Sequence, residues 1–125
     1  MNVVAAVIEK DGLVLICQRK RGSRHELKWE FPGGKVEAGE ELRTALAREL
    51  REELAIGAQI GEKIAHYEVQ YPGRSKIKLH FFRVTEFTGE PVNLEFEQIA
   101  WAERVKLADY DFLEGDVAFV KELSS

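Results

Sequence analysis

Two runs of apolar, largely β-branched residues, 3–8 and 13–17, stand near the start of the chain. They flank Glu9-Lys10-Asp11-Gly12, and an Asp-Gly pair between such runs is a strong signal for a tight hairpin turn. The pattern therefore predicts two paired strands. A short third strand is expected at Trp29-Glu30-Phe31, with Trp29 in the core.

A helix is predicted for residues 40–55, because this run has no Gly or Pro and is rich in Leu, Ala, Arg and Glu. Positions three and four apart share a helix face, so Leu46, Leu50 and Leu54 form an apolar stripe. Three acidic side chains project together beside that stripe: Glu49, Glu52 and Glu53.

The second half of the chain predicts a hairpin, a further strand and a helix. The hairpin consists of residues 63–71 and 76–81, joined by the turn Tyr71-Pro72-Gly73-Arg74. Residues 86–93 are expected to be a loop, and a last strand leads through Trp101. A final helix is expected to begin near Glu114. This order predicts an α/β fold with a mixed sheet between helices.

Length and charge narrow the class of protein. The chain has 125 residues, which suits one domain, 1–125, and a formal net charge of −4. That charge argues against a nucleic-acid polymer as the main partner, but not against a single nucleotide carried with Mg²⁺. Cys17 is the only cysteine, so no internal disulfide is possible, and we expect it to be a small core residue.

The N-terminal apolar stretch, 3–8, is too short for a signal-peptide core or a membrane span. We therefore expect a cytoplasmic location and no membrane partner. We also expect the chain to be a monomer.

Crowding of Glu49, Glu52 and Glu53 has two explanations. Like charges at this spacing cost roughly 0.2–0.5 kcal/mol per pair, and neighbouring arginines offset the repulsion if the face is simply solvated. The alternative is a bound cation. The glycine-rich turn Phe31-Pro32-Gly33-Gly34-Lys35 favours the cation, because backbone groups at glycine can approach an ion closely. Carboxylate and carbonyl oxygens are ligands that suit Mg²⁺.

The stretch from Gly34 to Ile56 resembles the signature of the Nudix hydrolases, G-x(5)-E-x(7)-R-E-U-x-E-E-x-G-U, where U is a bulky aliphatic residue. The matching positions are Gly34, Glu40, Arg48, Glu49, Leu50, Glu52, Glu53 and Ile56. One position departs from the signature, because Ala55 stands where the pattern has Gly. We expect the nearby Gly57 to take over the role of that glycine at the end of the helix.

The resemblance to the MutT-like branch of this family spans nearly the whole chain and implies an α/β/α sandwich. It implies Mg²⁺, with Mn²⁺ as a possible substitute, held by the carbonyl of Gly33 and the side chains of Glu49, Glu52 and Glu53. Glu95 resembles an additional glutamate that binds metal or acts as base in MutT-like relatives. Glu49 is our first choice for the general base and Glu95 the second, while Arg48 is expected to hold the carboxylates by ion pairing.

Four residues are candidates for substrate contacts. Arg19 ends a strand, where its guanidinium can be held towards a phosphate. Phe31 is either a core residue or a wall for the base, and Arg74 at the hairpin tip is either solvated or reaches the substrate. Asp116 either lies at a helix N-terminus or contacts the base, as an Asn or Asp does in similar relatives. His25, a lone histidine in a polar loop, is given no role.

The activity that the resemblance implies is hydrolysis of nucleoside triphosphates, including oxidised or modified ones, to a nucleoside monophosphate and pyrophosphate. One alternative is a Nudix hydrolase of another nucleoside diphosphate derivative, such as a nucleotide sugar. A second is a catalytically silent Nudix-fold binding module. Such a module would typically lack one of the helix glutamates, and here all are present. The preferred base and sugar stay open.

Overall fold

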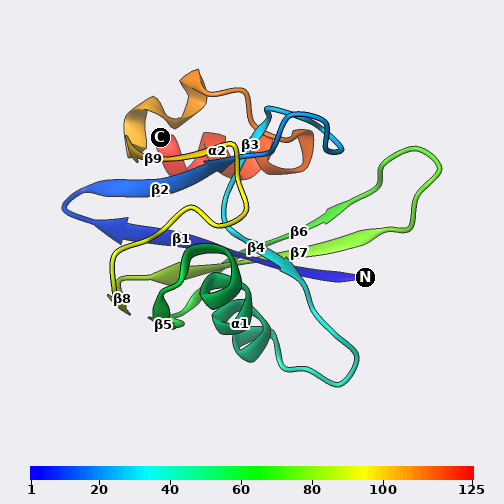
Figure 1. The fold of residues 1–125 in the computed structure, drawn as a ribbon. Helices are drawn as coiled ribbons and strands as arrows, with labels where there is room; N and C mark the ends of the chain where they lie inside the picture. The colour runs from blue at the N-terminus through cyan, green and yellow to red at the C-terminus, as the bar shows by residue number, and fades with distance from the viewer.

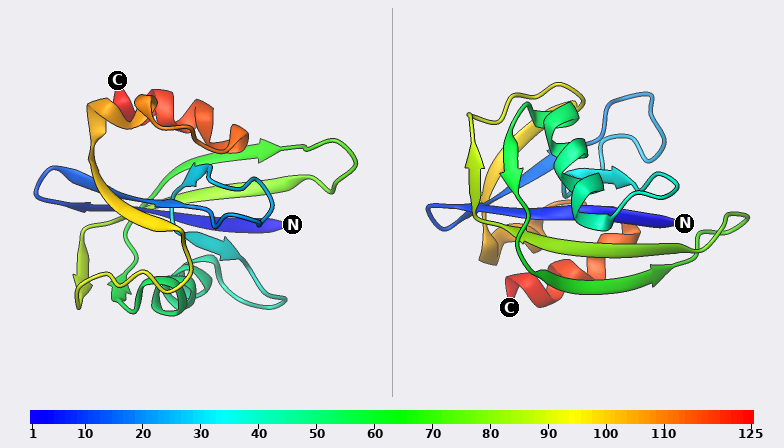
Figure 2. Two further views of the ribbon diagram at one scale, coloured as in Figure 1. Left: turned by 45° about the horizontal axis from the view of Figure 1, so that its top comes forward. Right: turned by 90° about the horizontal axis from the view of Figure 1, so that it is seen from below.

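A mixed β-sheet of seven strands forms the centre of the computed structural model, which describes residues 1–125. Helix α1 (Leu42–Leu54) covers one face and helix α2 (Val117–Ser124) the other (Figures 1 and 2). The strands are β1 (Asn2–Lys10), β2 (Leu13–Gln18), β3 (Trp29–Glu30), β4 (Gly33–Lys35), β6 (Lys63–Val69), β7 (Ile77–Val84) and β9 (Gln98–Glu103). The expected α/β/α sandwich is confirmed.

Strand β1 organises the sheet, whose main order is β3-β2-β1-β7-β6. It pairs in parallel with β7 along one edge. Its other edge is divided, because β4 pairs with Val3–Ala5 and β2 pairs only with Glu9 and Lys10. Strand β9 pairs with β2. This division brings the glycine turn at Gly33 beside the first residues of β1.

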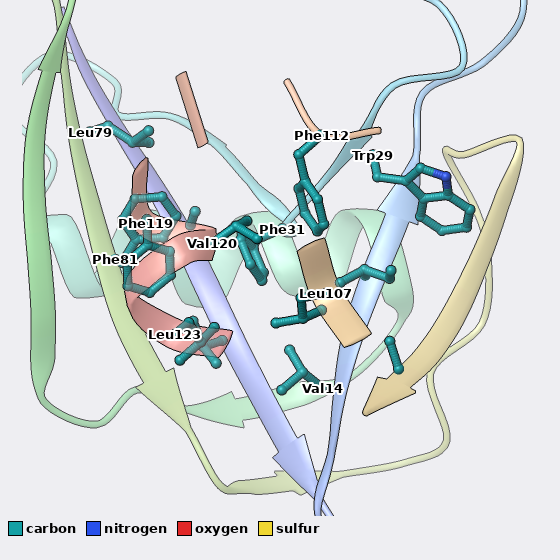
Figure 3. Close-up of a cluster of buried hydrophobic side chains, with 14 residues drawn as sticks. Val14, Trp29, Phe31, Leu79, Phe81, Leu107, Phe112, Phe119, Val120 and Leu123 are labelled. Carbon is teal, nitrogen blue, oxygen red and sulfur yellow. The ribbon is translucent and has the colours of Figure 1, made fainter. Parts of the chain in front are cut away.

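Apolar side chains fill both faces of the sheet. Alternation along β1 sends Val4, Ala6 and Ile8 towards α1, and Ala5 and Val7 towards α2. Figure 3 shows the cluster on the α2 side, where aromatic rings from the sheet and from α2 pack together. Leu46, Leu50 and Leu54 are fully buried on the α1 side, so the predicted apolar stripe of this helix is confirmed.

Both predicted hairpins are present. Asp11 and Gly12 have positive φ angles of 53° and 78°, as the tight turn between β1 and β2 requires. Strands β6 and β7 are antiparallel and form six residue pairs, with one irregularity between Lys63 and Ala65. Trp29 and Cys17 lie in the core as expected.

The loop expected at 86–93 was wrong in its first residues. Glu86–Thr88 forms strand β8, which pairs with strand β5 (Gly57–Gln59) in a separate two-stranded sheet. The pairing sets Phe87 opposite Ala58, and both side chains pack against the core on the α1 side. A run of three residues is too short to show the alternation that predicts a strand.

The C-terminal segment contains more helical structure than expected. A 3₁₀ helix, Arg104–Asp109, follows β9, and a short 3₁₀ turn, Glu114–Asp116, leads directly into α2. The final helix thus begins near Glu114, as predicted, but reaches α-helical geometry only from Val117.

The end of α1 also differs from the prediction. Ala55 itself adopts the left-handed conformation, with φ 56° and ψ 34°, and its N–H donates to the carbonyl of Arg51. Gly57 has no positive φ and belongs to β5, so it does not take over the cap. An L-residue in this conformation is strained by roughly 1–2 kcal/mol. No helix in the structure has the length and apolar character needed to cross a membrane.

Candidate active site

The glycine turn lies directly against the acidic face of α1. The N–H of Gly33 donates a hydrogen bond to the Glu53 carboxylate at 3.1 Å. A Cβ atom on Gly34 would lie 2.5–2.7 Å from the carboxylate atoms of Glu49. A Cβ on Gly33 would lie 1.9 Å from the carbonyl oxygen of Val4, so β4 can pair with β1 only because this residue is glycine.

Arg48 joins the carboxylates on the outer side of this face. Its guanidinium makes a bidentate contact with Glu40 at 2.8 and 3.0 Å, and reaches Glu49 at 3.0 Å and Glu52 at 3.3 Å. It also donates to the backbone carbonyl of Lys35. The hydrogen bonds from Arg48 lower the pKa of Glu40 to about 2. The guanidinium thus fixes the helix to the turn in front of it.

Negative charge is concentrated on the inner side of the same face. Burial, followed by the charge of Glu49, raises the pKa of Glu53 to about 9, and the carboxylates of Glu30 and Glu95 contribute to the shift. Burial likewise raises the pKa values of Glu49 and Glu30. Four carboxylates therefore approach one another here.

These residues suit a hard divalent cation. All the side-chain donors are oxygen atoms, and the mutual repulsion at Glu53 is of the kind that a cation relieves. The side chains do not form a closed set of three metal ligands, since Glu49 and Glu52 are turned to Arg48. Glu52 is the most exposed of the three, with 56% of its side chain accessible.

Glu95 lies on a short turn that is fixed at both ends. The Asn93 side chain accepts from the N–H of Phe96 and donates to its carbonyl oxygen, each at 2.8 Å. The N–H of Leu94 donates to the carbonyl of Glu53 at the end of α1. Phe96 is buried in the α1-side core. A small cavity of about 210 Å³ separates Glu95 from the helix, and Arg19, Glu30 and Glu53 also line it.

A larger cleft opens on the other side of Glu53. Its volume is about 570 Å³, within the range of ordinary small-molecule sites. The cleft extends from Gly33 and Glu53 to Asp116, and the rim carries the side chain of Arg74. Both cavities share the side chains of Arg19, Glu30 and Glu53.

Asp116 lies at the far end of the cleft and is 6% exposed. Burial raises its pKa to about 8, and the charge of Glu30 adds to the shift. Its side chain makes no hydrogen bond that caps α2. Asp116 thus lies at the N-terminus of α2, as one alternative expected, but its carboxyl group does not cap the helix and also lines the cleft.

Arg19 and Phe31, two of the candidates for substrate contacts, both make extensive contacts within the protein. The Arg19 guanidinium donates to Glu30 at 3.3 Å and to the carbonyl of Arg24 at 2.6 Å, so much of its donor capacity is used within the protein. Phe31 is 3% exposed and packs among Phe81, Phe112 and Phe119, as Figure 3 shows. It is mainly a core residue that contributes an edge to the cleft floor.

Sequence reasoning missed two groups at the cleft. Glu30 is predicted only as part of a short strand, although an acid between two large aromatics, Trp29 and Phe31, which are both buried, is a signal of a special environment. His25 was given no role, yet it lies on the cleft rim with its ring 5.4 Å from that of Tyr71. The Tyr71 hydroxyl accepts from the N–H of Gly115, which connects the β6–β7 hairpin to the Asp116 turn.

Comparison with known proteins identifies the family. The model of the NUDIX domain matches residues 1–123. The chain belongs to the Nudix family. The resemblance drawn from the stretch between Gly34 and Ile56 is thereby confirmed, and so is the expectation that the chain is a Nudix hydrolase.

Curated Nudix relatives match along almost the full chain. It is 40% identical over 121 residues to a CTP pyrophosphohydrolase of Escherichia coli (strain K12), covering 97% of this chain and 89% of the relative. It is 34% identical to an 8-oxo-dGTP diphosphatase of Haemophilus influenzae (strain ATCC 51907 / DSM 11121 / KW20 / Rd), covering 98% of this chain and 90% of the relative.

Solved Nudix structures agree with the fold. The solution structure of the E. coli ORF135 protein matches with a TM-score of 0.86 and 40% identity, covering 96% of this chain and 85% of that one. A MutT structure from work on Aliivibrio salmonicida and Vibrio cholerae matches with a TM-score of 0.83 and 32% identity, covering 98% and 95%.

Proposed function

We propose that this Nudix hydrolase cleaves nucleoside triphosphates, including oxidised or modified ones, to a nucleoside monophosphate and pyrophosphate, with Mg²⁺ or Mn²⁺ as cofactor. One observation carries the proposal: a cleft of nucleotide size has clustered carboxylates at one end and a buried Asp116 at the other. The acidic end suits a metal-carried polyphosphate, and the buried polar group suits a base edge. Relatives named for CTP and 8-oxo-dGTP support this substrate class.

The acidic end of the cleft would hold the metal. The candidate ligands are the carbonyl of Gly33 and the side chains of Glu49, Glu52, Glu53 and Glu95. A bound divalent ion supplies neutralisation of phosphate charge and a lowered pKa for water. Glu49, whose carboxylate is packed against Gly34, is our candidate to accept the proton of the attacking water, with Glu95 as the alternative. Arg48 would act by holding Glu49 and the turn in register.

The far end of the cleft would bind the nucleoside. Below its pKa of about 8, Asp116 carries a proton and can both donate and accept, so it can contact a base edge that offers one donor and one acceptor. Phe31, which lines the cleft, would support the base from the core side, and Arg74 and Arg19 would add positive charge. The proposal includes a single domain, 1–125, that acts as a monomer, since one chain supplies all these groups. A cytoplasmic location is part of the same proposal.

The test is a panel of nucleotides with Mg²⁺ in which pyrophosphate and phosphate are measured separately. The panel includes the common ribo- and deoxyribonucleoside triphosphates, their oxidised forms, and nucleotide sugars. Release of pyrophosphate from triphosphates supports the proposal. Turnover of nucleotide sugars alone, or release of phosphate without pyrophosphate, would contradict it.

A further inference from the structure

Glu30 occupies a position between the two ends of the candidate site. Its side chain lines both the 570 Å³ cleft and the smaller cavity in front of Glu95, a property shared only with Arg19 and Glu53. Its charge contributes to the raised pKa values of Glu53 at one end and of Asp116 at the other. Glu30 is therefore within electrostatic reach of both groups.

Arg19 holds the Glu30 carboxylate in place and favours its charged form. Arg19 donates to it at 3.3 Å, and that contact opposes the effect of burial, which raises the pKa of Glu30. Arg19 is itself fixed by its bond to the carbonyl of Arg24. About 19% of the Glu30 side chain is accessible, and this side chain lines both cavities while its carboxylate meets Arg19.

The backbone pairing of β3 does not require an acid at this position. Strand β3 is only two residues long, and its pairing with β2 uses backbone atoms of Glu30 and Trp29. An apolar or amide side chain would allow the same pairing. A half-buried carboxylate next to two other acids raises the local repulsion, which indicates that it serves a bound molecule.

A nucleotide spanning the cleft would place its sugar beside Glu30. With phosphates at Glu53 and the base at Asp116, the sugar is the part that lies between them. An ionised carboxylate only accepts hydrogen bonds, and the donors of a nucleotide sugar are its hydroxyl groups. An acidic side chain that accepts from a ribose hydroxyl is an established arrangement in dinucleotide-binding folds.

We propose that Glu30, positioned by Arg19, accepts a hydrogen bond from a sugar hydroxyl of the nucleotide. This contact makes the enzyme prefer nucleotides that carry that hydroxyl over nucleotides that lack it. This inference rests on the proposed function. A substrate without that hydroxyl leaves the carboxylate without its partner, and a hydrogen bond to a charged group is stronger than one to a neutral group. The hydroxyl should therefore be worth on the order of tenfold in kcat/KM.

The experiment compares wild type and Glu30→Gln on four forms of one nucleoside triphosphate: ribo, 2′-deoxy, 3′-deoxy and 2′,3′-dideoxy. Wild type should use the dideoxy form on the order of tenfold less well than the best form. Glu30→Gln should lose activity only on forms that carry the recognised hydroxyl and should be unchanged on the dideoxy form. Losses on the ribo and 3′-deoxy forms identify the 2′-hydroxyl as the recognised group, and losses on the ribo and 2′-deoxy forms identify the 3′-hydroxyl. Glu114→Gln, which removes an exposed acid from the Asp116 turn, is the matched charge control and should leave all four values unchanged.

Two further measurements separate this account from other roles of Glu30. Mn²⁺ affinity without nucleotide should fall only about two- to threefold in Glu30→Gln, because the carboxylate is not assigned to the metal and acts on it only through its charge near Glu53. An equal loss on all four forms, no loss on any form, or a large drop in Mn²⁺ affinity would overturn the inference. If wild type cleaves none of the four forms of any base tested, the proposed function fails instead, which is a distinguishable result.

Discussion

Glu53→Gln should stabilise the metal-free protein at neutral pH while nearly abolishing turnover. The pKa of Glu53 is raised from an ordinary 4.5 to about 9 in the folded protein. Between these values the folded protein keeps a proton that the unfolded chain has released. The folded state then binds more protons than the unfolded state, so the free energy of unfolding falls as pH rises through this window.

The size of the effect follows from the same shift. Each pH unit in the window corresponds to about 1.4 kcal/mol, and pH 7 lies about two and a half units above the ordinary pKa, so the penalty at pH 7 is about 3.5 kcal/mol. Glutamine does not titrate, and its amide is attracted to the neighbouring carboxylate of Glu49. The free energy of unfolding of the variant should therefore be within about 1 kcal/mol of the wild-type value near pH 5 and exceed it by roughly 3–5 kcal/mol at pH 7–8.

Urea unfolding in EDTA at several pH values measures this difference directly. Glu114→Gln serves as the control, because Glu114 is exposed and the substitution removes an equal charge. The stability of this control variant should follow that of wild type at every pH. Adding Mn²⁺ should make wild type more stable than Glu53→Gln, because the variant has lost a metal ligand and the ion stabilises it less. A stability difference between wild type and Glu53→Gln that stays constant from pH 5 to pH 8 would refute the reasoning.

The remaining predictions concern four residues. Glu95→Gln should lower kcat on the order of 10²-fold with little change in KM, and an unchanged kcat would remove Glu95 from the mechanism. Asn93→Ala should lower kcat in wild type but not in the Glu95→Gln background, because Asn93 acts only by holding the Glu95 turn; additive losses would contradict this. Ala55→Gly should raise the free energy of unfolding by about 1 kcal/mol and Tm by about 4 °C, measured by thermal denaturation, because glycine adopts the left-handed cap without strain. Asp116→Asn should change the ratio of activities on oxidised guanine and cytosine nucleotides and remove the change in that ratio near pH 8; the wild-type preference at every pH would show that the base is read elsewhere.

Features set by local pattern were predictable from the sequence. The leucine stripe and the acidic face of α1 follow from helical spacing, and the Asp11-Gly12 turn follows from its residue types. The position of Gly34 in front of Glu49 was predictable only through the family signature, because spacing alone does not bring a turn against a helix.

Features set by tertiary contact were not predictable. The place of Glu30 beside both cavities could not be predicted, because the residues that line them with it, such as Glu53 on α1 and Asp116 before α2, lie far apart in the sequence. Strand β8 exists because β5 offers it a partner, which a three-residue pattern cannot reveal. The cap at Ala55 was mispredicted because residue preference favoured Gly57, whereas Gly57 is committed to β5.

The central claim is tested most directly by the products that the enzyme forms from one nucleoside triphosphate. Phosphorus NMR of a complete reaction with Mg²⁺ should show one pyrophosphate and one nucleoside monophosphate for each triphosphate consumed, and no product in EDTA or with Glu53→Gln. Formation of nucleoside diphosphate and phosphate, or turnover that persists in EDTA, would contradict the account.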